Sequence, residues 1–424
     1  MSSTSNPERW AILDCNSFYC SCERLFHPHL RDKPIVVLSN NDGCIISLSK
    51  EAKAVGLKMG EPIFEVRSLI RRHRVQVFSS HYLLYGNLSR RVMGLLDQLN
   101  PEVIQYSIDE AFINFSHLPL GAEEMWALDL RERVTRETGI PVSLGVGHSK
   151  TLAKIANKEA KKLGLKSLSI TEPQVREDVL KRTPLEEVWG IGAGLSVRLR
   201  ALGLQSAWDF SQFENVSLIR KHLGIVGERM QAELQGRSCI ELGEIETRKM
   251  ISSTRSFGKK VMSLRELQEA VATYVGFAAE KLRKQGSLTR GVSVMLRSNP
   301  FDDGPYHRRE DQRILPFYTD DTFVLTRAVT EMVAQLFKEG IGYKKAGVFL
   351  FDLADKNAYQ LDLFHQASTE QKLMGVLDKI NDRWGRGTIK TASCGTIQDW
   401  RMLCEKKSSK TQTSWSDLVE VGAD

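Results

Sequence analysis

The 424-residue sequence predicts an α/β (α+β) protein of about two to four domains. Three observations favour this class. The N-terminal part alternates strand-like and helical segments, the middle holds two short helical segments around Gly190-Ile191-Gly192, and a second alternation of strands and helices starts near Arg248. The composition, 42% hydrophobic and 26% charged, is that of an ordinary multidomain protein with a substantial core.

The N-terminal segments follow the order strand, helix, strand, strand, helix, strand, which is typical of a ferredoxin-like domain. The first strand is WAILDC, and apolar residues at helical spacing over about 84–99 predict the first helix. The hairpin EVIQYSIDEAFINF, a helix over roughly 122–137 and the strand PVSLGVG complete the order, and KPIVVLS predicts a further strand. The first strand and the hairpin are then neighbours in one sheet, so we expect Asp14 to lie near Asp109 and Glu110.

Two adjacent carboxylates, Asp109 and Glu110, lie within the predicted hairpin, in the sequence YSIDEAF. In a regular strand, neighbouring side chains point to opposite faces and could not both serve one site. At the tip of a hairpin this alternation breaks, although a solvated turn would explain the same residues. Together with Asp14, the two acids would offer the oxygen ligands that Mg²⁺ prefers, in a two-metal site for phosphoryl transfer.

Lysines recur along one face of a helix predicted in HSKTLAKIANKEAKKLG, and apolar residues occupy its other face. The lysines are Lys150, Lys154, Lys158 and Lys161. A cationic face beside the acids would suit a phosphate-bearing substrate, and a solvated lysine face is the alternative interpretation.

Two further stretches favour a polyanionic partner. In LEEVWGIGAGLSVRLRALGL, two short helices joined by Gly190, Ile191 and Gly192 predict a helix-hairpin-helix, whose backbone N–H groups bind DNA phosphates; a simple tight turn is the alternative. Residues 248–297 hold eleven Lys and Arg against three acids, a local charge of about +8, which favours a polyanion or forms a solvated basic face.

The C-terminal part predicts a second small α/β domain, with the strands TRSFGKKV, GVSVMLRS and KKAGVFLFDL and a helix after each of the first two. Beyond Asp355 the chain is polar and predicted to be irregular, except for QLDLF. Exposed apolar residues in a polar tail indicate a short peptide that docks into a partner, and an edge strand is the alternative.

The seven cysteines are an odd number without a pair of CxxC units, so we expect reduced thiols and no structural zinc. No apolar run reaches the length of a membrane span, and the N-terminus lacks the apolar region of a signal peptide. We expect no membrane association and a location in the cytoplasm.

Eight segments, in order and at about the same spacing, resemble the Y-family translesion DNA polymerases: LDCNSFYCSCERLF, KPIVVLSNNDGCII, EAKAVGLKMGEP, YSIDEAF, GVGHSKTLAKIAN, VWGIG, RSFGKKV and QLDLF. The chain is most similar to the UmuC branch, which includes the catalytic subunit of DNA polymerase V and its plasmid- and phage-borne relatives. The resemblance runs from about Trp10 to beyond Trp400 and implies a right-hand polymerase. Its implied domains are a ferredoxin-like palm at 8–26 and 81–172, small fingers at 27–80, a helix-hairpin-helix thumb at 173–243, an α/β little finger at 247–355, and a tail at 356–424 with a clamp-binding peptide at 360–364.

The same resemblance implies roles for single residues. Asp14, Asp109 and Glu110 would be the catalytic ligands of two Mg²⁺ ions, with the backbone carbonyl of Cys15 as a further ligand. Phe18 and Tyr19 would contact the incoming nucleotide, with Tyr19 as the steric gate against the ribose 2′-OH. The remaining implied contacts are Lys53 and Lys161 with the triphosphate; Lys150, Lys154, Gly190, Ile191 and Gly192 with DNA; and Gln360, Leu361, Leu363 and Phe364 with a sliding clamp.

Two positions depart from the pattern of the branch. Leu48 stands where an arginine is common, with Lys50 two residues on as a substitute, and this puts the fingers' contact with the nucleotide in doubt. Cys20 stands where a small alanine is usual, directly beside Tyr19. Neither departure removes a metal ligand.

The function implied is error-prone translesion synthesis, in which dNTPs are added to a primer 3′ end opposite damaged bases, within SOS mutagenesis. The implied partners are primer-template DNA, dNTPs, a β sliding clamp, a processed UmuD-type dimer and RecA, at the nucleoid. Two alternatives are a nucleotidyl cyclase that shares the palm and a catalytically inactive DNA-binding adaptor. The thumb motif and clamp-like peptide disfavour the first, and the presence of all three acids disfavours the second.

Overall fold

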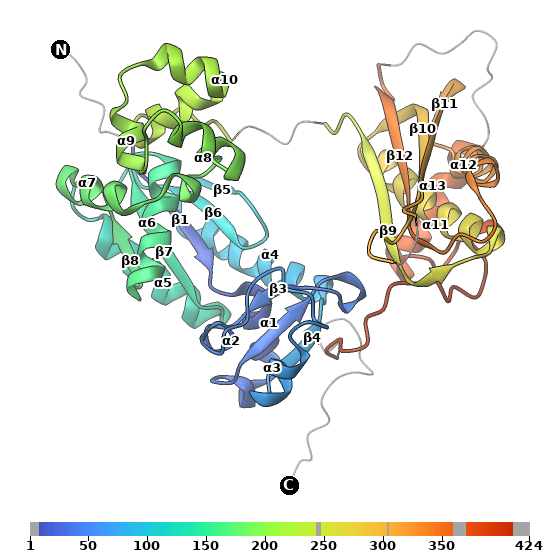
Figure 1. The fold of residues 1–424 in the computed structure, drawn as a ribbon, viewed down its shortest axis with the longest axis horizontal. Coiled ribbons are helices and arrows are strands. Elements are labelled where there is room, and N and C mark those ends of the chain that lie inside the picture. The colour runs from blue at the N-terminus through green and yellow to red at the C-terminus, as the bar shows by residue number, and fades with distance from the viewer. Residues whose placement is uncertain (1–7, 243–246, 303–304, 359–369, 410–424) are drawn as a thin grey trace. The chain divides into compact units, whose positions relative to one another are not determined.

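The computed structural model describes residues 8–242, 247–302, 305–358 and 370–409, which fall into two compact units. The first unit combines residues 1–39, 44–244 and 406–424, and the second combines 40–43 and 245–405. Figure 1 shows the elements of each unit. Within the described residues, no helix is both long and apolar enough to cross a membrane.

A five-stranded sheet with the order β5-β6-β1-β7-β8 forms the centre of the first unit. Its strands are β1 (Trp10–Cys15), β5 (Val103–Gln105), β6 (Glu110–Asn114), β7 (Val142–Gly147) and β8 (Ser167–Ser169). β1 pairs antiparallel with both β6 and β7, as the ferredoxin-like order requires. The predicted palm topology is therefore confirmed, with β8 as an added parallel edge.

Helices cover both faces of this sheet because its strands alternate two apolar sets of side chains. Ala11 and Leu13 pack in the cluster that includes α1 (Phe18–Phe26), α4 (Tyr82–Leu99) and α5 (Glu123–Thr138). Ile12 and Phe112 face the opposite side, where Ala153 of α6 (Lys150–Leu163) packs on them. Asp14 follows the parity of Ile12, so its side chain projects toward α6.

A second, three-stranded sheet with the order β3-β2-β4 lies in the predicted finger region. Its strands are β2 (Ile35–Leu38), β3 (Ile45–Leu48) and β4 (Gln76–Ser79), with the short helices α2 (Lys50–Ala54) and α3 (Arg67–Arg72) between them. The four residues of β2 are all buried, as expected for a continuous apolar run in a central strand.

The thumb region is helical and holds α7 (Pro173–Arg182), α8 (Ala193–Arg200), α9 (Ala207–Gln212) and α10 (Val216–Leu234). The first helix expected in the helix-hairpin-helix is only a 3₁₀ turn over Leu185–Glu187, so this prediction was wrong in detail. Gly190 has a φ of +91°, and a Cβ there would lie 2.2 Å from the Met230 methyl group. The turn into α8 therefore requires glycine.

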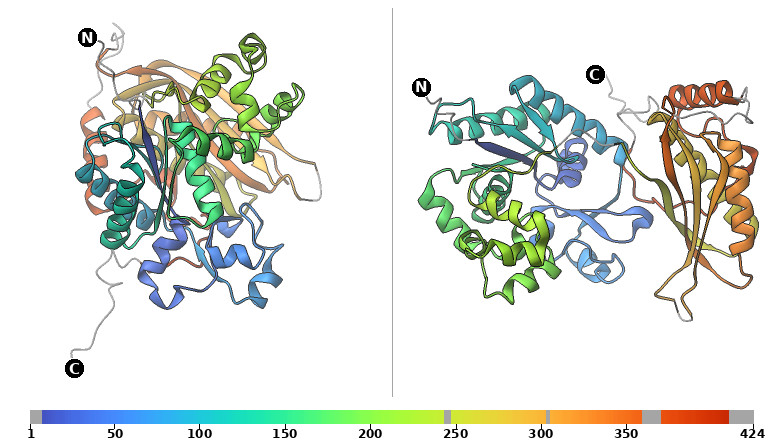
Figure 2. Two further views of the ribbon diagram at one scale, coloured as in Figure 1. Left: turned by 90° about the vertical axis from the view of Figure 1, so that its left-hand side faces the viewer. Right: turned by 90° about the horizontal axis from the view of Figure 1, so that it is seen from above.

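The second unit is a four-stranded sheet with the order β11-β10-β12-β9. The strands are β9 (Ile251–Val261), β10 (Ser287–Ser298), β11 (Arg308–Thr319) and β12 (Tyr343–Asp355), and the helices are α11 (Leu264–Lys284), α12 (Thr322–Leu336) and α13 (Glu370–Trp384). The apolar sides of α11 and α12 share one core with the sheet, and Figure 2 shows the helices of this unit beside the sheet. The sequence prediction missed β11 and α13.

The chain beyond Asp355 is not the irregular polar tail that was expected. α13 is a helix of 15 residues, and the segment after it returns to the core of the second unit. Trp400 is only 3% exposed and meets the rings of Phe257 and Tyr274 edge-on, at centroid distances of 6.2 and 5.7 Å. The backbone N–H of Gly258 also donates to the carbonyl oxygen of Trp400. These residues are an integral part of the second unit.

Candidate active site

Asp14, Asp109 and Glu110 lie together at one end of β1 and β6. Asp14 is the direct cross-strand partner of Glu110, and opposed residues of an antiparallel pair project to the same face. Asp109 immediately precedes β6, and its carbonyl oxygen accepts a hydrogen bond from the backbone N–H of Cys15 at 2.9 Å. The structure thus brings together the three acids that the sequence predicted to be neighbours.

Ser107 shapes the hairpin tip that carries two of these acids. Its hydroxyl oxygen accepts hydrogen bonds from the backbone N–H groups of Asp109 and Glu110, at 3.2 and 3.0 Å, and donates to Asp109 Oδ1 at 2.7 Å. The two neighbouring carboxylates nevertheless lie on different sides of the site, because Glu110 and Asp109 line different cavities. Sequence reasoning missed Ser107, although a serine two residues before an acid is typical of such side-chain turns.

Glu110 faces a small aromatic cluster on the α6 side of the sheet. Lys154 Nζ lies 2.9 Å from both carboxylate oxygens of Glu110 and 4.4 Å and 5.4 Å from the ring centroids of Tyr106 and Trp189. The Trp189 indole N–H donates to the Tyr106 hydroxyl at 3.2 Å, and both rings contact Phe112. Cation–π contact with these rings holds the ammonium group of Lys154 against Glu110.

Asp14 is paired with Lys161 in the same part of the site, with Lys161 Nζ 2.5 Å from Asp14 Oδ1. Burial raises the pKa of Asp14 above its ordinary value; Lys161 lowers it, and the neighbouring charges of Glu110 and Asp109 raise it further. Mutual repulsion among three carboxylates is the electrostatic signature of a site that attracts cations.

Asp14 lines two cavities, one on each side of the acids. The cavity on the α6 side measures about 270 Å³ and also exposes Glu110, Lys154 and Lys161. The cavity on the α1 side measures about 300 Å³, and its lining includes Asp109, Tyr19 and Lys53. The second cavity gathers residues from the palm and from the finger region, as a nucleotide pocket between them would require. Cys15 and Phe18 also line it.

Tyr19 is held rigidly in this second cavity. Its ring stacks on Tyr85 with centroids 4.4 Å apart and an interplanar angle of 15°, and Tyr82 meets it edge-on. The Tyr85 hydroxyl in turn donates to Glu23 at 2.6 Å. Tyr85 was not identified from the sequence, because a tyrosine in an apolar helical pattern signals only core packing.

The structure shows what surrounds the two residues that depart from the family pattern. The Cys20 thiol is fully buried and contacts the carbonyl oxygen of Ile35 at 3.5 Å and the Ser47 hydroxyl at 3.4 Å, so it packs against the finger strands. Leu48 ends β3 and lines the Tyr19 cavity with an apolar side chain. Lys53, rather than Lys50, is the lysine of α2 among the lining residues.

The lysines of α6 that were predicted to contact DNA have partners within the protein. Lys150 is only 4% exposed and its Nζ lies 3.8 Å from the centroid of the Trp10 ring, so it cannot reach DNA as it stands. Lys154 is committed to Glu110, and Lys158 pairs with Glu187 at 3.4 Å. Lys154, Lys158 and Lys161 line one cavity together, so the expected cationic face is present there without Lys150.

The glycine turn that was predicted to bind DNA phosphates leads into α8. Ile191 is buried at 2% exposure, and Gly192 is the residue that caps α8. Gln360, Leu361, Leu363 and Phe364, which were predicted to bind a clamp, lie outside the described residues.

The oxygen ligands offered by the three acids suit a hard cation, although their carboxylates do not point to one common position in this structure. In the part of the chain that the structure covers, no three His, Cys, Asp or Glu side chains stand ready to hold a metal ion. Lys154 draws the Glu110 carboxylate toward the aromatic cluster, and Lys161 holds Asp14. Carboxylate and carbonyl oxygens at the ends of paired strands are nevertheless the ligands that Mg²⁺ prefers.

Three family models match the chain. Residues 13–158 match the impB/mucB/samB family, residues 248–363 match the C-terminal domain of that family, and residues 371–421 match a domain of unknown function (DUF4113). Protein UmuC of Salmonella typhimurium (strain LT2) is 39% identical over 423 residues, covering 97% of this chain and 100% of the relative. DNA polymerase IV of Pelotomaculum thermopropionicum is 27% identical over 386 residues, covering 89% and 93%.

Among solved structures, a Y-family DNA polymerase chimera of Dbh and Dpo4 matches with a TM-score of 0.65 and 19% identity, covering 81% of this chain and 98% of that one. This likeness confirms the predicted polymerase fold class. The relatives confirm a DNA polymerase of translesion synthesis and favour neither the cyclase nor the inactive adaptor. The chain belongs to the impB/mucB/samB family, in the UmuC branch of the Y-family DNA polymerases.

Proposed function

We propose that this polymerase adds dNTPs to a primer 3′ end opposite damaged template bases, with Asp14, Asp109 and Glu110 as its catalytic acids. The observation that carries the assignment is the cross-strand pairing of Asp14 with Glu110, beside a cavity of about 300 Å³ lined by Tyr19 and Lys53. A deoxynucleotide in that cavity would place its triphosphate toward the acids and its sugar toward Tyr19.

Two Mg²⁺ ions are the cofactor that best fits the acids, with the backbone carbonyl of Cys15 as a further oxygen ligand. When bound, such ions lower the pKa of an attacking hydroxyl and neutralise charge on the transferring phosphate. For the carboxylates to serve as ligands, Lys154 and Lys161 must give up part of their contact with Glu110 and Asp14. Lys161 is then available to bind a triphosphate oxygen.

The remaining residues bind and orient the substrates. Lys53 lies on the α1 side of the acids and supplies a second cation for the triphosphate. Phe18 and Tyr19 pack under the sugar, where an aromatic ring excludes a 2′-OH by contact. The turn of Gly190, Ile191 and Gly192 binds the DNA backbone through N–H groups, without reading sequence.

We further propose partners that recruit the enzyme to damage. Residues 360–364 bind a β sliding clamp, which raises the local concentration of the polymerase at the primer end. A processed UmuD-type dimer and RecA bind the chain beyond Phe364. The enzyme acts in the cytoplasm at the nucleoid during SOS mutagenesis, and its small fingers lower fidelity because few contacts penalise a wrong pair.

The test is primer extension opposite an abasic site, with Mg²⁺, dNTPs, clamp, processed UmuD-type dimer and RecA filament supplied. The wild type should insert a nucleotide and Asp109→Ala should not, whereas Asp97→Ala, at an exposed position of α4, should behave like the wild type. Failure of the wild type with all these partners present would overturn the assignment. Deleting residues 360–364 should remove the stimulation by clamp and leave clamp-independent synthesis unchanged.

A further inference from the structure

We propose that α13 and the loop after it form a docking site for an acidic amphipathic segment of a partner protein. The site lies in the second unit, within the stretch that matches the domain of unknown function. It does not depend on the proposed reaction, because none of its residues belongs to the acids or to the nucleotide cavity. It gives a surface and a partner chemistry to the chain beyond Phe364, where partner binding is proposed above.

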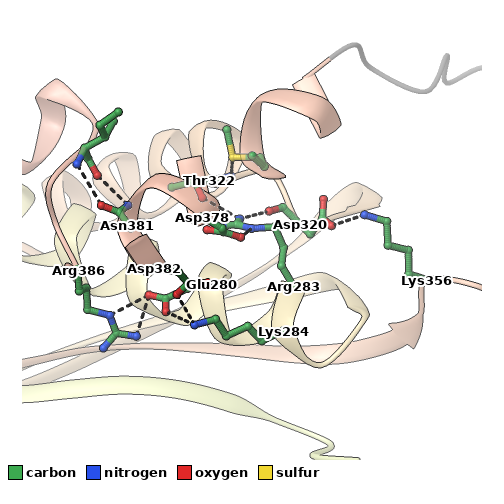
Figure 3. A network of polar contacts seen from close by, with 12 residues as sticks. Glu280, Arg283, Lys284, Asp320, Thr322, Lys356, Asp378, Asn381, Asp382 and Arg386 are labelled. Atoms are coloured by element: carbon green, nitrogen blue, oxygen red, sulfur yellow. Dashed lines mark hydrogen bonds and ion pairs between the residues drawn. The ribbon is translucent and has the colours of Figure 1, made fainter. Parts of the chain in front are cut away.

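One face of α13 is fixed to the second unit by ion pairs with α11 and by the buried side chain of Met374, which is 1% exposed. Asp378 accepts two hydrogen bonds from the Arg283 guanidinium, at 2.6 and 2.8 Å, and Asp382 pairs with Lys284 at 2.9 Å. Figure 3 shows both aspartates directed toward these cations. Such bidentate pairing is a specific and strong contact. Asp378 is therefore held inward, whereas Asp382, whose side chain is 59% exposed, pairs with Lys284 at the surface.

The opposite face of α13 is apolar and open to solvent. Leu373 is 50% exposed, Val376 is 52% exposed and Trp384 is 62% exposed, with half-buried Ile380 between them. Their spacing of three, four and four residues places them on one stripe of the helix. A surface helix normally buries its apolar stripe, so this inverted arrangement is typical of an interaction surface.

A cavity of about 130 Å³ continues this stripe between α13, α11 and the following loop. Its apolar lining includes Phe277, Leu377 and Ile389. Leu377 also neighbours the stripe, because it lies four residues after Leu373 and three before Ile380. At Gly276, also in the lining, a Cβ atom would meet nothing within 4 Å. An apolar side chain from a partner therefore has room to enter.

The charges around this surface favour an acidic partner. Exposed Lys379 and Arg383 border the stripe, and Lys390 and Arg401 border the cavity. The acids in the cavity wall are paired: Asp378 with Arg283, as described above, and Glu280 with Arg386 and Lys284. Exposed Asp399 lies 3.6 Å from Lys259. The unneutralised charge is therefore positive, which steers and orients an acidic segment.

An amphipathic peptide fits these features better than DNA does. Phosphates would meet the lysines and arginines but would leave Leu373, Val376 and Trp384 in water. A helix with an apolar side and acidic flanks covers both the stripe and the cations, in the helix-in-groove mode of recognition.

The test measures binding of labelled designed peptides to the full-length protein by fluorescence anisotropy. The first peptide has about 18 residues, with leucines at helical spacing and glutamates elsewhere. The second replaces every glutamate with lysine, and the third keeps the composition of the first but scrambles its apolar spacing. We expect only the first to bind, and a single-stranded oligonucleotide not to displace it.

Substitutions locate the site. Lys379→Glu with Arg383→Glu, and separately Trp384→Ser, should weaken binding by about tenfold or more. Gly276→Leu should fill the cavity and so also weaken binding. Leucine has a high helix propensity, close to that of alanine, so α11 should stay folded. Arg327→Glu on α12 and Met125→Ser on α5 are matched controls that should change nothing. Basal primer extension and thermal unfolding should stay unchanged in all the variants.

Equal binding of the basic peptide, or binding of the acidic peptide that none of the α13 variants weakens, would overturn the proposal. Displacement of the peptide by the oligonucleotide would overturn it in favour of a DNA-binding face. Loss of primer extension without loss of peptide binding would count against the proposed catalytic function alone, so the two failures are distinguishable.

Discussion

At the scale of single residues, the packing of Tyr19 would make this proposed steric gate selective. The ring is stacked flat on Tyr85, and Tyr82 meets it edge-on, so it cannot swing away from a bound sugar. A small side chain at this position would leave space for a 2′-OH.

We expect Tyr19→Ala to admit ribonucleotides and Tyr19→Phe to keep sugar discrimination, because the ring and not the hydroxyl makes the contact. The measurement is the ratio of kcat/KM for dCTP and CTP opposite guanine. A ratio in Tyr19→Ala that equals the wild-type ratio would show that Tyr19 does not select the sugar.

Glu23, which accepts a hydrogen bond from the Tyr85 hydroxyl, gives a prediction about stability. Burial raises the pKa of the Glu23 carboxyl; the hydrogen bond from Tyr85 and the charge of His27 lower it by less. The folded protein therefore holds this proton more tightly than the unfolded chain. The contribution of Glu23 to the free energy of unfolding is full below about pH 4 and is lost as pH rises through the folded-state pKa.

Glu23→Gln should remove this pH dependence, since a neutral amide still accepts the hydrogen bond from Tyr85. The urea midpoint of the variant, relative to wild type, should therefore be higher at pH 7 than at pH 4.5. The same difference between the two proteins at both pH values would contradict the account.

At the scale of elements, the cluster of Tyr106, Phe112, Trp189 and Lys154 links the hairpin that carries the proposed catalytic acids to the start of the predicted thumb. Trp189 directly precedes the glycine turn proposed to bind DNA, and its indole N–H holds the Tyr106 hydroxyl. Lys154, which the cluster surrounds, contacts Glu110. This chain of contacts offers a physical route from DNA binding to the position of a catalytic acid.

Lys154→Met should keep the packing of its alkyl chain and free Glu110 to bind metal, so it should lower the Mg²⁺ concentration needed for half-maximal incorporation with little change in DNA affinity. Single-turnover incorporation and DNA titration measure the two quantities. Lys158→Met, one turn further on and paired with Glu187, is the matched control. A parallel loss of DNA affinity would indicate that Lys154 contacts DNA instead.

Elements whose apolar pattern decides their place were predictable from the sequence. β1, the hairpin with β6, α4, α5 and α6 all have regular apolar spacing, and the pairing of Asp14 with Glu110 followed from their order. β11 was missed because RREDQR has no apolar alternation; as a charged edge strand, it resists pairing with other chains. α13 was missed because it is fixed by ion pairs whose partners lie about a hundred residues away.

The acidic residues of the site were predictable from the sequence, but the placement of its lysines was less so. Residue types and chain order identify Asp14 near the end of β1, Asp109 directly before β6 and Glu110 at the start of β6. Nothing local in the sequence shows that Lys150 is buried on Trp10 or that Lys154 enters an aromatic cluster. Those placements depend on which helix face meets the sheet, a tertiary property.

At the scale of the whole molecule, the second unit depends on the segment that follows α13. Trp400 lies in its core against Phe257 and Tyr274. Trp400→Ala should destabilise this unit by about 3–5 kcal/mol, the usual cost of deleting a large buried aromatic side chain. Differential scanning calorimetry of the full-length protein measures it.

Trp384→Ala provides the control for this substitution, because Trp384 is 62% exposed and should contribute little to stability. An equal effect of the two substitutions would show that the segment around Trp400 does not complete the core.

The most direct test of the central claim measures the rate of single-nucleotide incorporation by Glu110→Gln on undamaged primer-template. Rapid-quench experiments give this rate at a series of Mg²⁺ concentrations. The comparison is Glu102→Gln, a charge-neutralising change near the other strand of the same hairpin, where Glu102 contacts Asn114. If Asp14, Asp109 and Glu110 hold the ions, Glu110→Gln should lose about a thousandfold or more in rate at every Mg²⁺ concentration while still binding DNA, and Glu102→Gln should match the wild type. Incorporation by Glu110→Gln within about twofold of the wild-type rate would contradict the assignment.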